Sequence, residues 1–229
     1  MRTLERLFVW AGGALFVTAL AVTAYWYVGT LGRTDEPHRS PVVSILTDAA
    51  IFSLFACHHS IFARGPVKTA LARLVPERLL RALYVWIASG LMMAVPAFWR
   101  PIGFTLYRAS SPWLTVLLTI VQLAGLGLIA RSVAAIDPLE LAGIRHGRSS
   151  ALQITGPYRL VRHPLYLGWM LSLFGAPHMT GDRLAFAAIS SAYLIVAIPW
   201  EERSLHLAFG DAYAQYARAV KWRVLPYVY

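Results

Sequence analysis

The sequence has 229 residues, of which 58% are hydrophobic and only 14% are charged. Soluble domains usually carry about 25% charged residues, so this composition excludes an ordinary soluble domain and indicates a membrane protein. The formal net charge of +10 does not indicate a nucleic-acid partner, because Lys and Arg beside membrane spans reflect topology and anionic lipid.

The first predicted element is a hydrophobic run over residues 8–28, which carries no charge and is long enough to cross a hydrocarbon core of about 30 Å. Arg2 and Arg6 precede this run, as basic residues do in a signal peptide. The run is longer than the apolar region of a signal peptide, which is about 7–15 residues, so we expect an uncleaved first span.

Five further hydrophobic runs follow along the chain. They cover residues 42–62, 82–99, 113–130, 165–179 and 184–200. Only helices and closed barrels satisfy their backbone hydrogen bonds in lipid, and runs this long are not alternating barrel strands. The sequence therefore predicts an all-α polytopic membrane helix bundle with about five to six transmembrane helices. We expect a single integral-membrane domain over residues 1–229, with the first four spans in residues 1–134.

The last two runs differ from the others. Residues 165–179 are short for a full crossing, and the sequence leaves open whether this span crosses fully. The chain then turns through residues 180–182, so residues 184–200 are expected to return as the antiparallel partner in a C-terminal helical hairpin. Residues 201–218 follow with apolar and aromatic side chains at helical spacing, which predicts an amphipathic surface helix. These side chains are Leu205, Phe209, Ala212, Tyr213 and Tyr216.

Lys and Arg are unevenly divided between the two sides that six spans define. One side, which holds both termini and the loops 63–81 and 131–163, has 16 of the 21, and the other side has 5. The positive-inside rule therefore predicts that both termini are cytoplasmic. Loop 63–81 also predicts a short basic interfacial helix around residues 67–74.

Two motifs inside the spans have ordinary explanations. Gly125-Leu126-Gly127 fits the glycine pattern of a dinucleotide-binding turn, but it lies in a hydrophobic run without a preceding strand. Small residues that let helices pack closely account for it better. Cys57-His58-His59 is not expected to bind a metal, because adjacent helical residues point about 100° apart. One of the two histidines is expected to face the bundle interior, while the position of Asp48 in the same run stays open.

The segment 153–168 carries polar groups that these explanations do not cover. Tyr158, Arg162 and His163 precede Pro164, which suits the first turn of a helix whose positive end attracts a carboxylate. A glutamate pair, Glu201-Glu202, lies at the end of the hairpin partner and would meet His163 if the hairpin packs antiparallel. Ionisable groups at membrane depth are costly and indicate a functional site. A positive-inside flank beside an ordinary helix end explains the cations but not the glutamates.

These motifs resemble the C-terminal half of the isoprenylcysteine carboxyl methyltransferase superfamily, and phospholipid N-methyltransferases share parts of them. The motifs are Gly156-Pro157-Tyr158, Arg162-His163-Pro164, Tyr166, Gly168, Glu201-Glu202, Leu205, Phe209-Gly210, Tyr213 and Tyr216. In the rest of the chain, residues 55–64, 76–78, 137–145 and 175–180 are similar to stretches of bacterial methanethiol S-methyltransferases.

The resemblance implies an enzyme of the bacterial inner membrane that uses S-adenosyl-L-methionine, bound by the half 135–229. It implies S-methylation of a small thiol such as methanethiol, giving dimethyl sulfide. The cofactor-binding residues that it implies are Leu152, Gln153, Gly156, Tyr158, Arg162, His163, Tyr166, Glu201 and Glu202. His59 or His163 would be the catalytic base, and the sequence does not choose between them. The expected partners are a small apolar or thiol substrate and membrane lipids, with no nucleic acid and no metal.

One departure from the superfamily bears on the methyl acceptor. Eukaryotic isoprenylcysteine enzymes carry an arginine one helical turn before the glutamate pair, where this chain has Ala197. A prenylcysteine carboxylate would lack that partner, which disfavours carboxyl methylation. O- or N-methylation of a lipid-like or isoprenylcysteine acceptor stays an alternative, as does a non-catalytic membrane protein of the same fold. The sequence does not determine the oligomeric state.

Overall fold

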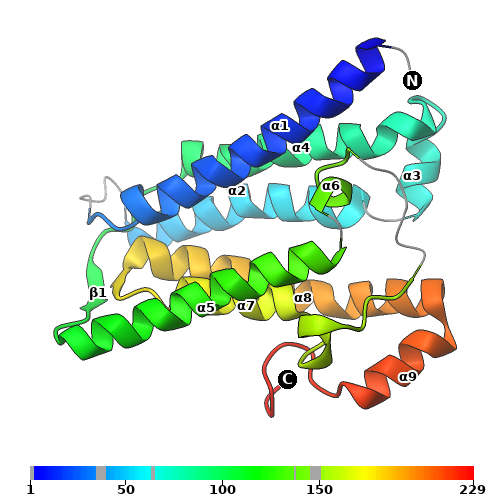
Figure 1. Ribbon diagram of the computed structural model, residues 1–229. Coiled ribbons are helices and arrows are strands. Elements are labelled where there is room, and N and C mark those ends of the chain that lie inside the picture. The colour runs from blue at the N-terminus through cyan, green and yellow to red at the C-terminus, as the bar shows by residue number, and fades with distance from the viewer. Residues whose placement is uncertain (1–2, 35–39, 63–64, 137, 145–150) are drawn as a thin grey trace. The chain divides into compact units, whose positions relative to one another are not determined.

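A computed structural model describes residues 3–34, 40–62, 65–136, 138–144 and 151–229 (Figure 1). Within these residues the chain is almost entirely helical. Five helical segments are long and apolar enough to cross a membrane. They are α1 (Thr3–Tyr25) with its π-helical end (Trp26–Thr30), α2 (Pro41–Phe62), α4 (Glu77–Phe98), α5 (Pro112–Ile136) and α8 (Gly181–Phe209). The prediction of an all-α polytopic membrane bundle is confirmed.

Helix α7 (Pro164–Phe174) is too short to cross a membrane alone. Its 11 residues extend about 16 Å, roughly half of a hydrocarbon core. The chain then enters the short strand β2 (His178–Thr180), which pairs with β1 (Thr105–Arg108). The sequence did not predict these strands, because segments of three and four residues in a loop carry no measurable periodicity.

The prediction of an amphipathic surface helix over residues 201–218 is wrong in its bounds. Helix α8 continues to Phe209, and a separate helix α9 (Asp211–Ala219) follows. Gly210 between them has a φ of +51°, in the left-handed region that side chains disfavour, and this conformation ends α8. Glu201 and Glu202 therefore lie inside a long helix rather than in the first turn of a surface helix.

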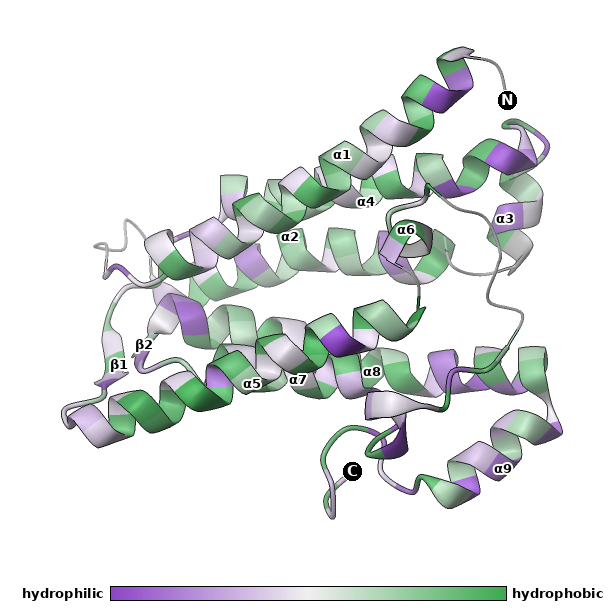
Figure 2. Cartoon of the chain, in the orientation of Figure 1, coloured by the Kyte–Doolittle hydropathy of each residue, from purple (hydrophilic) through white to green (hydrophobic). Residues whose placement is uncertain are grey.

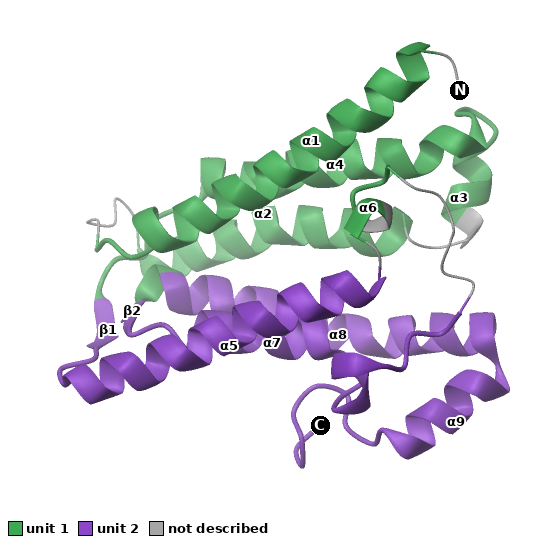
Figure 3. Ribbon diagram, in the orientation of Figure 1, with its two compact units in different colours: residues 1–104, 138–148, 180–182 green, residues 105–137, 149–179, 183–229 purple. Residues whose placement is uncertain are grey.

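The chain forms two compact units (Figure 3). The first comprises residues 1–104, 138–148 and 180–182, and the second comprises the rest. In the first unit α1 and α2 both pack on α4, and the short helices α3 (Gly65–Leu71) and α6 (Pro138–Leu141) belong to the same unit. Helix α3 overlaps the short basic helix that the sequence predicts around residues 67–74. Each unit is described by itself below.

Two buried carboxylates hold the chain where it leaves α4. Asp48, whose position the sequence left open, is fully buried on α2 and accepts a hydrogen bond from the Arg100 amide at 2.8 Å. Asp182 accepts hydrogen bonds from the Trp99 indole at 2.8 Å and from the Ile102 amide at 3.0 Å. Both aspartates therefore have structural partners in the first unit.

In the second unit α5 and α7 cross closely at two glycines. A Cβ on Gly125 would lie 2.5 Å from the Ser172 amide nitrogen, and a Cβ on Gly168 would lie 2.7 Å from the Gly125 carbonyl oxygen. A Cβ on Gly127 would meet no described atom within 4 Å. The packing interpretation of the glycine motif is thus confirmed for Gly125 alone.

The long helices consist mostly of apolar residues (Figure 2), and many of their large apolar side chains are exposed. In the most apolar stretch of α5 only 6% of the residues are buried. A soluble protein does not expose an apolar surface of this extent, so lipid is the solvent that these helices require.

A buried core cluster of the second unit consists of Val161, Leu167, Met170, Ile198 and Val224.

Candidate functional site

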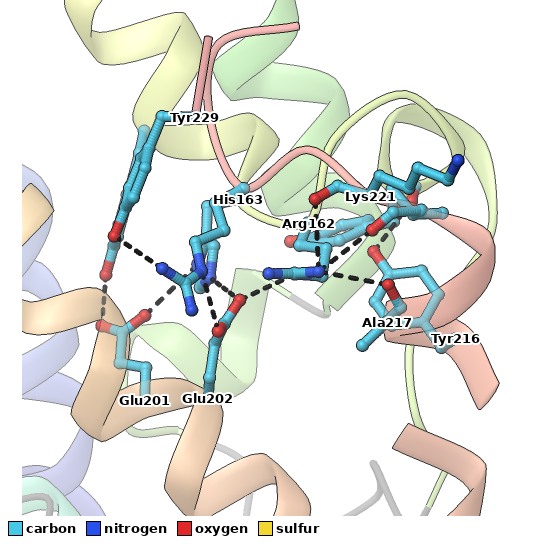
Figure 4. A network of polar contacts seen from close by, with 12 residues as sticks. Arg162, His163, Glu201, Glu202, Tyr216, Ala217, Lys221 and Tyr229 are labelled. Atoms are coloured by element: carbon cyan, nitrogen blue, oxygen red, sulfur yellow. Dashed lines mark hydrogen bonds and ion pairs between the residues drawn. The ribbon is translucent and has the colours of Figure 1, made fainter. Parts of the chain in front are cut away.

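A polar cluster in the second unit joins the start of α7 to the later part of α8 (Figure 4). The His163 Nδ1 atom lies 3.5 Å from Glu201 Oε2, and the Nε2 atom lies 3.5 Å from Glu202 Oε1. His163 is only 8% exposed, and its ring stacks on Tyr166 with the ring centroids 5.2 Å apart. The structure therefore brings the histidine of the 153–168 segment to both glutamates.

Glu202 is held by two guanidinium groups. Its carboxylate accepts hydrogen bonds from Arg162 Nε at 2.7 Å and from Arg223 Nε at 3.0 Å, and its side chain is 13% exposed. The Nη1 atom of Arg162 also donates to the carbonyl oxygens of Ala217 and Val220, both at 3.2 Å (Figure 4). Arg162 and Glu202 are thus engaged with other parts of the chain.

Glu201 has different surroundings from its neighbour. It accepts a hydrogen bond from the Tyr166 hydroxyl, and its side chain is 41% exposed. Among the residues that the structure describes, no Lys or Arg forms an ion pair with it. Glu201 is therefore the carboxylate of the cluster that remains open to a cationic ligand.

Tyr158 stands in a 3₁₀ turn (Gly156–Arg159) that precedes α7. Its carbonyl oxygen accepts a hydrogen bond from the Tyr216 hydroxyl at 2.8 Å, which ties the turn to α9. Burial, and then the Glu201 carboxylate, raise the pKa of the Tyr158 phenol to about 12. The phenol therefore remains protonated at physiological pH.

The remaining predicted cofactor residues lie at this turn and just before it. Gly156 has a φ of +60°, and a Cβ placed on it would meet no described atom within 4 Å, so its backbone is open to a ligand. The Gln153 side-chain amide donates to the Thr155 hydroxyl at 2.8 Å, a contact within its own segment rather than with the glutamates. Leu152 is half-buried beside Gln153.

Arg223 belongs to the cluster, although its charge was expected only from membrane topology. The backbone of its segment pairs with the residues before α7: the Arg162 amide donates to the Trp222 carbonyl at 2.9 Å, and the His163 amide donates to the Arg223 carbonyl at 2.8 Å. A signal was present in the sequence, because apolar and cationic residues alternate from Val220 to Val224. Alternation of period two is typical of an extended segment with one buried face.

The other predicted base, His59, lies in the first unit near the end of α2. It is exposed, and its Nδ1 atom shares a hydrogen bond with the Tyr84 hydroxyl of α4. The neighbouring His58 is buried and stacks on the Tyr84 ring, so His58 is the histidine that faces the interior. Within the described ranges, no group of three or more His, Cys, Asp or Glu side chains is arranged to hold a metal ion.

The chain is similar over most of its length to several methanethiol S-methyltransferases. It is 33% identical over 221 residues to methanethiol S-methyltransferase 1 of Bradyrhizobium diazoefficiens, an alignment that covers 91% of this chain and 75% of that protein. The methanethiol S-methyltransferase of Mycobacterium tuberculosis is 31% identical over 225 residues, with 91% and 92% covered. That of Crocosphaera subtropica is 30% identical over 241 residues, with 98% and 94% covered.

No family model and no solved structure matches the chain. The similarity to the three enzymes extends over both units, so it is not confined to the polar cluster. Of the stretches quoted for the resemblance, Ala63, Arg64, Asp137 and Arg145 lie outside the described residues.

Proposed function

The chain belongs to the methanethiol S-methyltransferase family of membrane methyltransferases, and from this premise we propose that it methylates a small thiol such as methanethiol with S-adenosylmethionine as the methyl donor. The observation that carries the proposal is Glu201, a partly exposed carboxylate that contacts His163 and two tyrosines but forms no ion pair with a described Lys or Arg residue. A site of this kind suits a ligand that carries positive charge.

The residues of the cluster fit S-adenosylmethionine in charge. The cofactor carries a sulfonium and an ammonium group, which Glu201 complements, and Tyr158 and Tyr166 supply aromatic faces for cations. The open backbone at Gly156 leaves room for a ligand to approach the chain. When bound, the cofactor supplies an electrophilic methyl group. We assign two groups of residues to this site. Arg162 and Glu202 hold the site in place through their contacts with each other and with the chain. The residues that bind the cofactor are Leu152, Gln153, Gly156, Tyr158, His163, Tyr166 and Glu201.

His59 of the first unit and His163 of the second are both candidates for the base that takes the proton of the thiol. A thiol becomes a strong nucleophile only as the thiolate, so an imidazole base would promote the reaction. His59 is exposed and is oriented by Tyr84, whereas His163 is buried between two carboxylates and stacked on Tyr166. With either base, the rate acceleration arises from base catalysis and from positioning the two reactants in line.

A carboxylate acceptor fits this chain less well than a thiol. The turn of α8 before Glu201 carries the buried Ala197, which offers no positive charge to a prenylcysteine carboxylate. For the membrane we propose the bacterial inner membrane with both termini cytoplasmic, with α7 and the extended residues after it counted together as a sixth crossing, because 16 Lys and Arg then lie on that side. The polar cofactor then enters from the cytoplasm, and a small apolar thiol enters through the bilayer.

The test uses protein purified in detergent. Calorimetry measures the binding of S-adenosylmethionine, and headspace gas chromatography measures dimethyl sulfide after methanethiol is added. We expect binding followed by product. Binding without product would redirect the proposal to O- or N-methylation of a lipid-like acceptor, and a folded sample that binds no cofactor would support the non-catalytic alternative.

A further inference from the structure

The segment 220–224 is built into the core of the second unit. Its backbone pairs with Arg162 and His163, at distances of 2.9 Å and 2.8 Å between donor and acceptor. Val224 is 1% exposed and packs in the core cluster with Val161 of the segment before α7. The main chain of His163 is therefore held from one side by residues that lie far along the sequence.

The side chain of Arg223 extends from this segment to Glu202. Its Nε atom donates to Glu202 Oε2 at 3.0 Å, and its Nη1 atom donates to the Tyr229 hydroxyl at 3.0 Å. The guanidinium group also lies 5.1 Å from the centroid of the Tyr229 ring. These contacts fix Arg223, and Arg223 in turn fixes one oxygen of Glu202 while Arg162 fixes the other.

In this arrangement the two adjacent glutamates differ in how many guanidinium groups are paired with their carboxylates. Glu202 is neutralised by Arg162 and Arg223, whereas Glu201 retains a carboxylate with no guanidinium paired to it among the described residues. A cation that approached Glu202 would meet two positive charges, whereas Glu201 offers an approach free of a paired arginine. Successive residues of a helix point about 100° apart, so the two carboxylates leave α8 in different directions, and Glu201 contacts Tyr166 and His163 instead of the arginines.

We propose that the two glutamates have different roles in the cofactor site, one in binding and one in positioning, and that Arg223 is a positioning residue. Glu201 binds the positively charged part of S-adenosylmethionine. Glu202, Arg162 and Arg223 form a clamp that orients His163, which contacts Glu201, and the clamp directs both guanidinium groups to Glu202 rather than to Glu201. The inference rests on the proposed function, because it requires that the cluster binds this cofactor.

The experiment compares four variants in detergent: Glu201→Gln, Arg223→Ala, Arg223→Lys and Lys221→Ala. Calorimetry at a temperature well below unfolding measures the Kd for S-adenosylmethionine, and circular dichroism measures the Tm. Lys221→Ala is the matched control, because Lys221 is an exposed cation of the same segment and contributes only its backbone carbonyl to the cluster.

We expect Glu201→Gln to raise the Kd about tenfold or more while the Tm stays near that of the wild type, because a charge-assisted contact to the ligand is lost. Arg223→Ala should raise the Kd by a similar factor and also lower the Tm. Arg223→Lys should recover part of the affinity, since an ammonium can contact Glu202 but cannot also reproduce the forked contact to Tyr229. Lys221→Ala should change neither quantity.

A wild-type Kd in the Arg223→Ala variant, with a lowered Tm, would reduce Arg223 to a purely structural role and overturn the inference. An unchanged Kd in Glu201→Gln would overturn it as well. These failures differ from failure of the proposed function, in which the wild-type protein itself would bind no S-adenosylmethionine and the inference would fall with it.

Discussion

Glu201 and Glu202 are adjacent in the sequence, yet their side chains have different environments. Glu202 contacts Arg162 and Arg223, and Glu201 contacts Tyr166 and is more exposed. Identical residue types therefore acquire separate roles from the helix geometry and from residues before α7 and after α9. The same holds for the histidine pair on α2, where one ring is buried and the other is exposed.

The residue-scale prediction concerns the base. If His59 is the base, replacing it by Ala should lower kcat for methanethiol about 100-fold, because a general base typically contributes between about 10²- and 10⁴-fold. The Kd for S-adenosylmethionine should stay unchanged, since His59 is not among the residues assigned to the cofactor. Headspace measurement of dimethyl sulfide gives kcat, and calorimetry gives the Kd.

Two further measurements sharpen this prediction. Raising the pH should restore part of the His59→Ala activity, because the thiolate then forms without a base. Tyr84→Phe, which removes only the hydroxyl that orients His59, should produce a smaller loss of kcat than His59→Ala. An unchanged kcat in His59→Ala would exclude this residue as the base.

At the scale of elements, the crossing of α5 and α7 positions the start of the site. Gly125 and Gly168 bring the two helices to backbone contact, and α7 begins immediately after His163. Gly210 then separates α8 from α9, so α9 can place Tyr216 against the carbonyl of Tyr158. The functional residues are thus carried by elements whose junctions are set by individual glycines.

The element-scale prediction compares two glycines of the same helix. Gly125→Val should destabilise the protein by about 1–3 kcal/mol, the usual cost of overpacking, because a Cβ there would lie 2.5 Å from the Ser172 nitrogen. Gly127→Val is the matched control, since its Cβ would meet no described atom within 4 Å. Thermal unfolding in detergent would contradict the packing interpretation if both variants lost the same stability.

At the scale of the whole molecule, alkaline stability is set by buried phenols. Burial, and then nearby carboxylates, raise the pKa values of Tyr158 and Tyr213 to about 12. A raised pKa means that folding favours the neutral phenol. Its contribution to stability is therefore complete below the unfolded pKa of about 10 and is lost as the pH rises through about 12.

We accordingly expect the Tm to be constant on approach to pH 10 and to fall between about pH 10 and 12. Circular dichroism at a series of pH values measures the Tm, and ultraviolet absorbance follows phenol ionisation. Tyr158→Phe and Tyr213→Phe should each make the decline shallower, whereas Tyr227→Phe, a substitution at an exposed side chain, should not. A decline that is equally steep in all three variants would refute this explanation.

The long hydrophobic runs were sufficient to predict the membrane helices, because a span in lipid needs about 20 apolar residues irrespective of what packs against it. The block 153–168 and the glutamate pair likewise identified the polar cluster, since chemically costly residues stand out in an apolar chain. These features are local in the sequence, and local patterns can be interpreted one segment at a time.

Tertiary structure decided the features that depend on distant residues. The sequence could not predict that α8 passes through residue 201 and ends at Phe209, because Pro199 and Trp200 were equally compatible with a helix end. It could not assign Glu202 to a clamp with Arg223, which lies 21 residues away and reaches it through a backbone pairing with His163. By itself the sequence determined which residues are polar in an apolar chain, because that depends on residue type alone. The packing of the second unit decided that Glu202 pairs with two arginines and that Glu201 contacts Tyr166 and His163, because those contacts join residues far apart in the sequence.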